Sequence, residues 1–447
     1  PGLAEVKHVY QDVKITSDDP ASGRFNIQNR FYFKSLKGYE VRYTVLADGK
    51  SIRKGRLKFS TPAQCDEDFT IRLPKLRKRK GYLINFDVVT TEASALLKKG
   101  HVAATEQFLL KEAGHKPYKA RKASCKIEDD GNSIVISSSK VRFVFDREQG
   151  IVTSYMVRGQ EMLADGFGIR PSFWRAPTDN DYGNGWPART QDFKTASREF
   201  SASATAENTT SGAVLNVCYD LPSGNEYHVA YEVLANGIVK VHADFRGVPA
   251  DGKAIEVPRV GLRFRLPAKD DRFSYFGRGP QECYWDRQSG ARKGIYETSA
   301  SGEYVPYVRP QENEHHTGCS WLKTGGLAIV GDGMFEFNVL RNSVEDFDSE
   351  EVVKHDYQWD NLSPDEVHDM EAARNVRRRQ HHIDDVVPQD YMEVCIDGVH
   401  SGIGGYDSWW AKAEPERTAW SDRDYSFGFT IVPHKVMRSS RAVKFAY

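Results

Sequence analysis

Two stretches of this 447-residue sequence combine residue types that bind ligands with the glycines and prolines of loops. They are SFWRAPTDNDYGNGW at 172–186 and GVHSGIGGYDSWW at 398–410. The D-N-D triplet in the first imitates the start of a calcium loop, but its glycine comes one position early and position twelve is Thr190 instead of glutamate. The pattern therefore favours a turn whose Asn and Asp side chains bond their own backbone.

Other side chains that could do chemistry lack the surroundings they need. The histidine pairs at 315–316 and 381–382 are consecutive, and consecutive strand residues point to opposite faces, so we interpret them as surface histidines and not as metal ligands. The basic runs at 75–80 and 377–379 have no interleaved aromatics, which favours solvated edges over a nucleic-acid surface. No Ser-His-Asp, Walker or dinucleotide motif stands in its required strand–helix context.

The tryptophans provide the remaining chemical signal. Most of the eight stand among Gly, Asn and Asp, where an indole can stack on the C–H face of a pyranose while amides and carboxylates bond its hydroxyls. Each one alone is explained by core packing. In GIGGYDSWW the neighbouring glycines leave the rings accessible, so a sugar-binding loop is as good an interpretation as a buried one.

The elements that must position these loops are mainly strands. Alternation of period two dominates the chain, and the pairs at 48–49 (Asp-Gly) and 236–237 (Asn-Gly) predict tight turns of antiparallel hairpins. One helix is predicted from Ser363, where an N-cap hydroxyl, a proline and a glutamate follow one another. The strict strand–helix alternation of an eight-fold barrel is missing from the sequence.

A polar, basic, aperiodic stretch near 111–126 predicts a domain boundary. We expect an all-β chain with a sandwich of immunoglobulin size at 1–112, a linker at 113–121 and a larger domain at 122–447.

Composition excludes several classes of partner. Lys plus Arg and Asp plus Glu both number 62, so no global field attracts nucleic acid or an anionic membrane. No apolar run approaches the roughly 20 residues of a bilayer span. The six cysteines are too sparse for a disulfide scaffold and do not separate cytoplasm from periplasm. Because PGLAEVK has neither an initiator Met nor a signal-peptide pattern, we expect the chain to be part of something longer.

Four segments together resemble one family. PGLAEVKHVYQDVKI, FWRAPTDNDYG, YFGRGPQECYWDRQSGARKGIYE with YVPYVRPQENEHHTGCSWL, and GVHSGIGGYDSWW are similar, in this order, to the C-terminal two domains of the large β-galactosidases of glycoside hydrolase family 2. The resemblance covers essentially the whole chain. It implies an immunoglobulin-like β-sandwich followed by the β-galactosidase small-chain domain, a large supersandwich resembling galactose mutarotase folds.

The resemblance also implies a division of labour. In the family, the glutamates that perform retaining hydrolysis of terminal β-galactosides lie on a preceding (β/α)₈ barrel, so we expect no catalytic residue here and no activity of this chain alone. The small-chain domain completes the sugar pocket. The family's tryptophan matches Trp409, which we expect to stack on the galactoside with about 1–3 kcal/mol, and Asp407 to orient its loop.

Other loops are expected beside the pocket or the barrel interface. A turn opening at Gly150 resembles a flexible segment of the family, and glycine suits a hinge. Asp179, Asn180 and Asp181 belong to a rigid loop presented towards the barrel, with Arg175 available for an interdomain ion pair. In GRGPQECYWDR, the charged residues 282, 286 and 287 are expected to form a buried network.

The resemblance sets expectations for cofactors and partners too. No cofactor or metal site is expected in this chain, whereas the complete enzyme uses Mg²⁺ or Na⁺ at its barrel. The partners are a galactoside and the catalytic barrel, with no nucleic acid or membrane, and the complete enzyme is expected to be a homo-oligomer.

Departures from the family pattern keep alternatives open. Cys283 stands where the family commonly has asparagine, and NEHHTGC is atypical, so the sugar specificity can differ. One alternative is a stand-alone carbohydrate-binding or mutarotase-like domain, which needs a His and a Glu converging on a sugar; His228, His242 or His400 could supply the imidazole. Another is a purely structural assembly domain.

Overall fold

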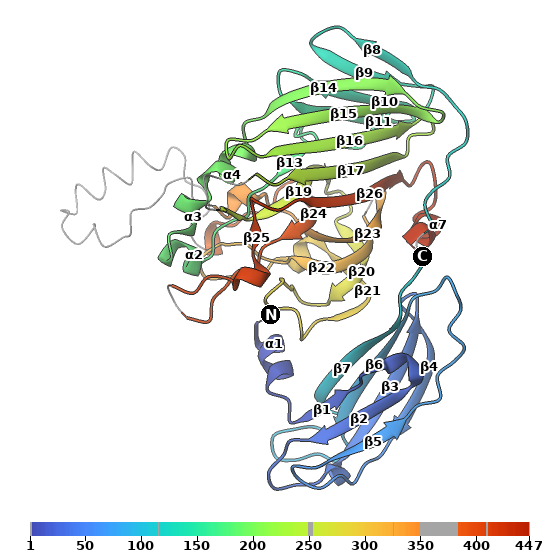
Figure 1. Ribbon diagram of the computed structural model, residues 1–447, viewed down its shortest axis with the longest axis vertical. Coiled ribbons are helices and arrows are strands. Elements are labelled where there is room, and N and C mark those ends of the chain that lie inside the picture. Colours follow the sequence, from blue (N-terminus) through green and yellow to red (C-terminus); the bar gives the residue numbers. More distant parts are fainter. Residues whose placement is uncertain are drawn as a thin grey trace, which may run out of the picture.

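The computed structural model describes residues 2–114, 116–248, 254–324, 326–348, 383–407 and 410–446. A small β-sandwich lies below a much larger β-domain, and the chain crosses from one to the other through a single extended segment (Figure 1). The all-β fold class, an immunoglobulin-like sandwich followed by a large supersandwich, is confirmed. The helix predicted from Ser363 and the histidine pair at 381–382 lie outside the described residues.

The small sandwich packs a three-stranded sheet, β1-β2-β5, against a four-stranded sheet, β4-β3-β6-β7. Phe25, Ile27, Ile84 and Phe86 are almost fully buried between them, as period-two alternation requires. The Asp-Gly pair at 48–49 forms the predicted turn, with both residues at positive φ. The strands are β1 (Val13–Thr16), β2 (Arg24–Asn29), β3 (Tyr39–Ala47), β4 (Lys50–Leu57), β5 (Asp66–Thr70), β6 (Tyr82–Thr90) and β7 (Val102–Lys111).

In the large domain a five-stranded sheet, ordered β12-β11-β10-β9-β8, covers part of a twelve-stranded antiparallel sheet. The first sheet contains β8 (Lys126–Asp129), β9 (Ser133–Ser137), β10 (Val141–Asp146), β11 (Ile151–Val157) and β12 (Gln160–Glu161). The path β13-β19-β24-β23-β26-β17-β16-β15-β14 forms the second, and β20, β21 and β22 branch from it.

The strands of the large sheet are β13 (Arg170–Ser172), β14 (Ser201–Asn208), β15 (Gly212–Asp220), β16 (Glu226–Leu234), β17 (Val239–Arg246), β19 (Arg259–Pro267), β20 (Arg272–Gly279), β21 (Arg292–Ser299), β22 (His316–Lys323), β23 (Leu327–Leu340), β24 (Tyr391–His400) and β26 (Tyr425–Pro433). A separate pair consists of β18 (Glu256–Val257) and β25 (Ala419–Trp420). Tyr227, Tyr231 and Val241 bury their side chains towards the smaller sheet, in the main core of this domain. The hairpin predicted at 236–237 is confirmed by the pairing of β16 with β17.

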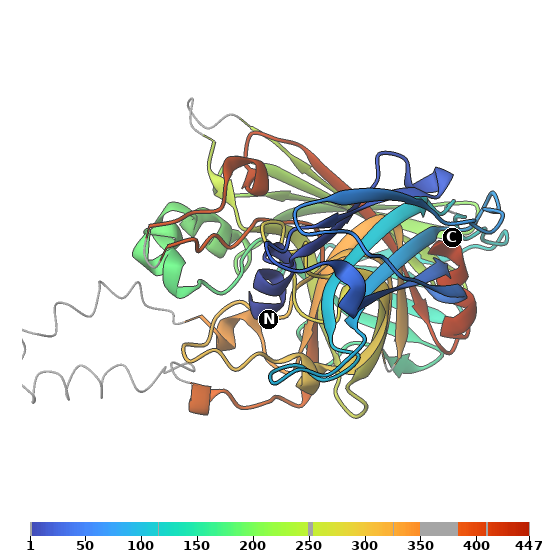
Figure 2. The same cartoon turned by 90° about the horizontal axis from the view of Figure 1, so that it is seen from below.

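The helices are short and gather at two places on the large domain. Figures 1 and 2 show α2, α3 and α4 at one end and α7 at the opposite end. None of the helices in the described part of the chain is long and apolar enough to span a bilayer. The helices are α1 (Gly2–Val9), α2 (Asp179–Gly183), α3 (Trp186–Arg189), α4 (Gln191–Ala196), α5 (Ala300–Glu303) and α7 (Ser439–Ala442).

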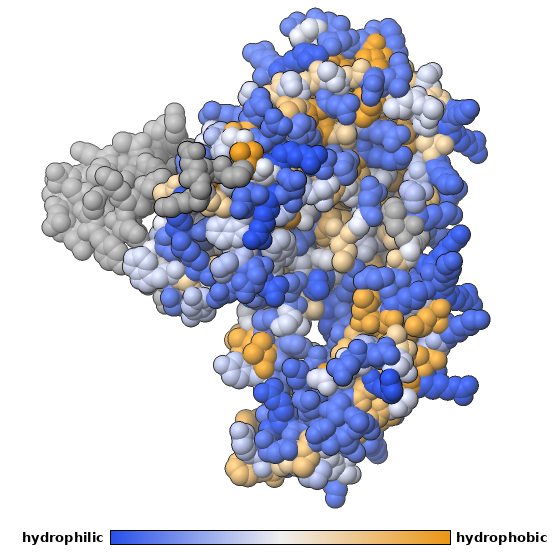
Figure 3. All heavy atoms as spheres, in the orientation of Figure 1, coloured by the Kyte–Doolittle hydropathy of each residue, from blue (hydrophilic) through white to orange (hydrophobic). Residues whose placement is uncertain are grey.

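The two domains meet through specific contacts. Gln107 of β7 both donates to the Lys293 carbonyl and accepts from its amide, each at 2.8 Å, and Arg292 pairs with Asp87 at 2.8 Å. Glu5 of α1 accepts two backbone N–H groups of the 289–290 turn. The outer side of α1 stays apolar and exposed, Leu3 at 82%, and shows as an orange patch in Figure 3.

The boundaries 1–112, 113–121 and 122–447 stay a prediction. The strands on either side of the linker end at Lys111 and begin at Lys126.

Candidate functional site

The segment 173–189 follows β13 and is held by a buried ion pair. The Arg175 guanidinium donates to both carboxylate oxygens of Asp181, at 2.5 and 3.1 Å, and only 1% of Arg175 is exposed. Asp181 also accepts the Thr178 amide at 2.7 Å, while the Thr178 hydroxyl accepts the Asp181 amide, which is the capping box of α2. The partner of Arg175 is therefore local, six residues along the same loop, and not a group of another domain.

This segment touches the second predicted loop. The Asn180 side chain donates to the Ala411 carbonyl, and the Asn184 amide reaches the same oxygen at 3.4 Å. Asp407 accepts the backbone N–H groups of Trp410 and Ala411, both at 2.8 Å. The structure thus brings Asn180 and Asp407 to the two sides of one loop, and we call residues 173–189 together with 400–413 the loop end.

The remaining predicted site residues lie as follows. Asp179 is exposed and pairs with Arg309 at 3.2 Å. Gly150, at φ +67°, forms the turn between β10 and β11 and packs against Phe200, beside the start of β14. Trp409 lies outside the described residues. The pocket and hinge roles given to these residues stay predictions.

Backbone bonds fix the base of the 400–413 loop. The Asp286 carboxylate accepts the Ile403 and Gly404 amides at 3.2 and 2.7 Å. Gly404 has φ +67°, and a Cβ there would lie 2.9 Å from backbone atoms of residues 411–413, so only glycine fits. The tip of the loop, in contrast, is exposed to solvent: Tyr406 and Trp410 are 78% and 76% exposed. The loop is firmly anchored and presents aromatic rings outward.

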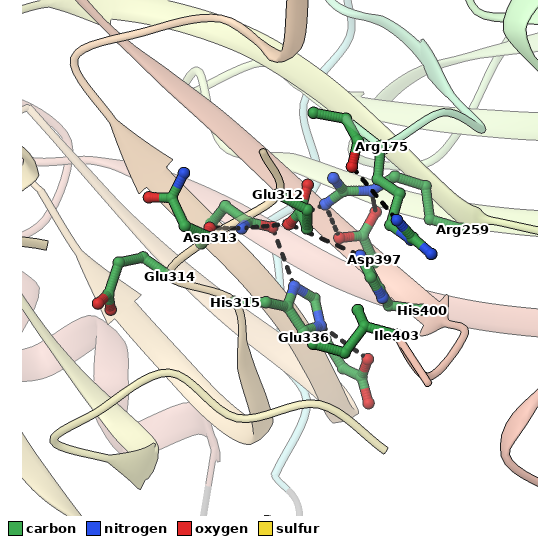
Figure 4. A network of polar contacts seen from close by, with 12 residues as sticks. Arg175, Arg259, Glu312, Asn313, Glu314, His315, Glu336, Asp397, His400 and Ile403 are labelled. Carbon is green, nitrogen blue, oxygen red and sulfur yellow. Dashed lines mark hydrogen bonds and ion pairs between the residues drawn. The ribbon is translucent and has the colours of Figure 1, made fainter. Parts of the chain in front are cut away.

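A buried polar network supports these loops (Figure 4). Arg259 of β19 donates through Nε and Nη2 to the two carboxylate oxygens of Asp397 on β24. The same Nη2 also donates to Asn338 Oδ1 at 2.9 Å. Asn338 in turn donates to Glu312 Oε1 at 2.9 Å. Arg259 and Asp397 are both fully buried, so each charge depends on the other for compensation.

His315 extends the network through both ring nitrogens. Its Nδ1 lies 2.9 Å from Asn338 Oδ1, and its Nε2 lies 3.0 Å from Glu336 Oε2. Burial lowers the pKa of His315 to about 4 and raises the pKa of Glu336 to about 8. At neutral pH the pair is therefore uncharged, with Nδ1–H donating to Asn338 and the protonated Glu336 donating to Nε2.

The interpretation of the 315–316 pair as surface histidines is wrong. Both rings are fully buried. The reason is that other rings pack against each histidine. Tyr275 and Phe337 cover His316, and Tyr284 and His400 cover His315. Two consecutive histidines suggest exposed side chains when only the sequence is known. Their burial becomes visible only from the residues that pack against them in the structure.

The charge network expected from residues 282, 286 and 287 forms only between Glu282 and Arg287. Glu282 pairs with Arg287 and also accepts the Tyr307 hydroxyl at 2.5 Å. Asp286 does not join this pair, because its carboxylate anchors the 400–413 loop.

Two glutamates do converge on one histidine. His316 Nε2 lies 2.7 Å from Glu303 Oε2 and 3.7 Å from Glu314 Oε2. Burial raises the pKa of Glu314 to about 10. A retaining glycosidase needs two carboxyl groups on opposite sides of a sugar, whereas these two share one buried imidazole and are 6% and 7% exposed.

Within the described part of the chain, three groups of side chains place possible metal ligands within 4.8 Å of one another: Glu303 with Glu314 and His316, Glu312 with His315 and His400, and Cys218 with Glu226 and His228. In the second group both nitrogens of His315 already have partners, and in the first the imidazole bonds Glu303. The third lies on the outer, solvent-facing side of the sheet.

The three histidines, any one of which could serve a mutarotase-like site, lie in two different places. His228 and His242 lie on β16 and β17 and pair with Glu226 and Asp244 on the exposed face. His400 is buried at the loop end, with its ring centroid 4.2 Å from that of His315.

Two family models match successive parts of the chain. The family model "Beta galactosidase small chain" matches residues 137–431, and "Beta-galactosidase, domain 4" matches 25–111. The chain belongs to the beta galactosidase small chain family.

Relatives of this family share modest identity over nearly the whole chain. The beta-galactosidases of Priestia megaterium and Streptococcus thermophilus are 28% and 26% identical over 97% of this chain. The chain spans only 40% and 39% of their lengths. Among solved structures, the galactose 1-epimerase of Lactobacillus acidophilus covers 70% of this chain and 98% of its own, at 7% identity and a TM-score of 0.31, too distant to support an argument.

Proposed function

We propose that this chain is the C-terminal part of a retaining β-galactosidase and completes its sugar pocket. The observation that carries the proposal is the junction of two family motifs, where the Asn180 side chain bonds the Ala411 carbonyl of the aromatic loop. Asp407 and Asp286 hold that loop from within. The loop then offers an indole wall, Trp409, to a terminal β-galactoside.

In this proposal the catalytic carboxylates belong to the barrel region of the longer protein. That region is also where Mg²⁺ or Na⁺ would act, and the complete enzyme would be a homo-oligomer. Arg175 and Asp181 would serve as positioning residues, since they hold the loop and face one another instead of a substrate.

The first experiment separates the two contributions. The isolated chain is incubated with a nitrophenyl β-galactoside, alone and then joined to the barrel region of a relative's enzyme. We expect no turnover from the chain alone and turnover once the barrel is supplied. Turnover by the chain alone would overturn the proposal.

The second experiment addresses the pocket. In the complete enzyme, Trp409→Ala should raise KM by about 5- to 150-fold, because a lost ring contact of about 1–3 kcal/mol translates into such a change. Trp410→Ala is the matched control, a neighbouring indole that is 76% exposed. Equal effects of the two substitutions, or no change with Trp409→Ala, would contradict a sugar-stacking role.

A further inference from the structure

A basic groove lies at the end of the large domain opposite the loop end. Its volume is about 810 Å³, and it is formed by the 118–123 linker, the tight turns near 140, 158, 211 and 235, and the segment 436–441. Figures 1 and 2 place α7, which borders it, far from α2 and α3. Seven cationic side chains line it: Lys119, Arg121, Lys122, Lys140, Arg158, Arg438 and Arg441.

These cations have no counter-charge of their own. No Asp or Glu of the described residues lines the groove, although acidic and basic residues are equally numerous in the chain. All seven side chains are exposed, and none forms an ion pair with a carboxylate in the part of the chain that the structure describes. Like charges around a concave surface concentrate a positive potential, which attracts anions.

The groove is preformed and has an apolar floor. Leu234, Val436 and Met437 lie among its lining residues. Its walls are tied together by backbone bonds, such as Arg158 N–H to the Lys140 carbonyl at 2.8 Å. A ligand would therefore meet an ordered surface, which reduces the entropy lost on binding.

We propose that the basic groove binds acidic carbohydrate, a chain whose sugars carry sulfate or carboxylate groups. The apolar floor suits the C–H faces of pyranose rings, and the cations around it suit the acidic substituents. The volume lies within the range of small-ligand sites, about 300–1,000 Å³. Binding at this end does not depend on the proposed hydrolysis at the other.

Single-stranded nucleic acid fits the groove less well. Such ligands need aromatic platforms on which bases stack. The aromatic residue of the lining, Tyr118, packs edge-on against Phe445 at 5.2 Å, and its hydroxyl accepts from Asn236 at 3.0 Å. The Tyr118 ring is thus held by contacts within the protein and does not offer a free face for a base to stack on.

The test measures binding of fluorescent probes to the full chain. The probes are a heparin oligosaccharide carrying sulfate, an oligogalacturonate carrying carboxylate, neutral dextran and a single-stranded DNA 20-mer. We expect one or both acidic glycans to bind, with an affinity that falls as salt rises, and dextran not to bind. The preferred probe distinguishes sulfate from carboxylate recognition.

Matched variants locate the site. Arg438→Glu with Arg441→Glu should weaken binding about tenfold or more, and Lys140→Glu with Arg158→Glu should do the same from the opposite wall. The control is Lys78→Glu with Arg79→Glu, two exposed cations of the small sandwich, which should change binding by less than about twofold. Unchanged thermal unfolding verifies that each variant is folded.

Three results would overturn the proposal. The first is that neither acidic glycan binds. The second is that the control pair weakens binding as much as the groove pairs, which would mean attraction to any surface cation. The third is that DNA binds at least as tightly as both glycans, which would make the groove a nucleic-acid site.

Discussion

The two ends of the large domain differ in whether their cationic side chains are buried and paired with carboxylates. At the loop end and in the network behind it, two cations are buried and paired: Arg175 with Asp181, and Arg259 with Asp397. At the basic groove, seven cations are exposed and have no carboxylate partner among the described residues. A paired buried charge holds backbone in place, whereas an unpaired exposed one is available to a ligand. The comparison therefore separates charges that position loops from charges that recruit partners.

The largest effect is expected from breaking a buried pair. Asp397→Asn leaves the Arg259 guanidinium buried without its counter-charge, and the free energy of unfolding should fall by about 3–5 kcal/mol in urea titrations. Arg121→Gln in the basic groove should change it by no more than about 0.5 kcal/mol. Similar decreases in the free energy of unfolding for the two variants would contradict the distinction between buried, paired charges and exposed, unpaired ones.

A second contrast concerns two glycines at positive φ. Gly159→Ala, beside Arg158, meets no atom within 4 Å and should cost only the left-handed backbone, about 1–2 kcal/mol. Gly404→Ala carries the same backbone cost and also a contact at 2.9 Å with atoms of residues 411–413. We expect it to cost more and to speed amide exchange across 402–413, measured by mass spectrometry. Equal exchange in both variants would show that the loop is not tightly closed.

The stability of the buried network behind the loop end should depend on pH through Glu336 and His315. The folded pKa of Glu336 is raised to about 8, so its contribution to stability is complete below the usual carboxyl pKa and is lost as pH rises through 8. The pKa of His315 is lowered to about 4. Its contribution to the free energy of unfolding is therefore complete above about pH 6.5 and is lost as pH falls below that value. Between about pH 6.5 and 8, Glu336 is therefore the member of this pair whose contribution changes.

Glu336→Gln isolates that effect, because the amide can still accept from Trp285 and donate to His315. The decline in unfolding free energy from about pH 6.5 to 8 should be smaller in this variant than in the parent chain, as followed by urea titration at each pH. An unchanged decline would assign it to other groups.

The smallest effect is expected at the groove, with the opposite sign. Arg438→Gln with Arg441→Gln removes repulsion between like charges, so the free energy of unfolding should rise by a few tenths of a kcal/mol at low salt. The gain should vanish at about 0.15 M salt, where surface charges are screened. A loss of stability would mean that these cations have structural partners after all.

The sequence predicts what depends on neighbours in the chain. The hairpins at 48–49 and 236–237 follow from turn chemistry and alternation, and both form. The pairing of Arg175 with Asp181 is also local, and the loop was recognised although a more distant partner was expected for the arginine. Family resemblance added the kinds of the two domains, an immunoglobulin-like sandwich and a small-chain supersandwich, to the order that the boundary stretch already indicated.

The rest depends on contacts between distant segments. Arg259 and Asp397 are 138 residues apart, and no periodicity links them. The burial of His315 depends on Tyr284 and His400, which pack against its ring from other segments. The basic groove likewise collects cations from segments that are up to hundreds of residues apart. Each of these features appears only when the sheet order is known.

The anchoring of the 400–413 loop by Asp286 has a consequence for sequence variation. Since the fastening involves backbone amides at 403 and 404, and the Asn180 contact reaches a backbone carbonyl, neither depends on which side chains occupy the tip. The exposed side chains of Tyr406 and Trp410 can therefore be exchanged without loosening the base, whereas Asp407 cannot, because its carboxylate accepts the Trp410 and Ala411 amides. These two exposed positions can thus vary while the backbone contacts at the base of the loop stay the same.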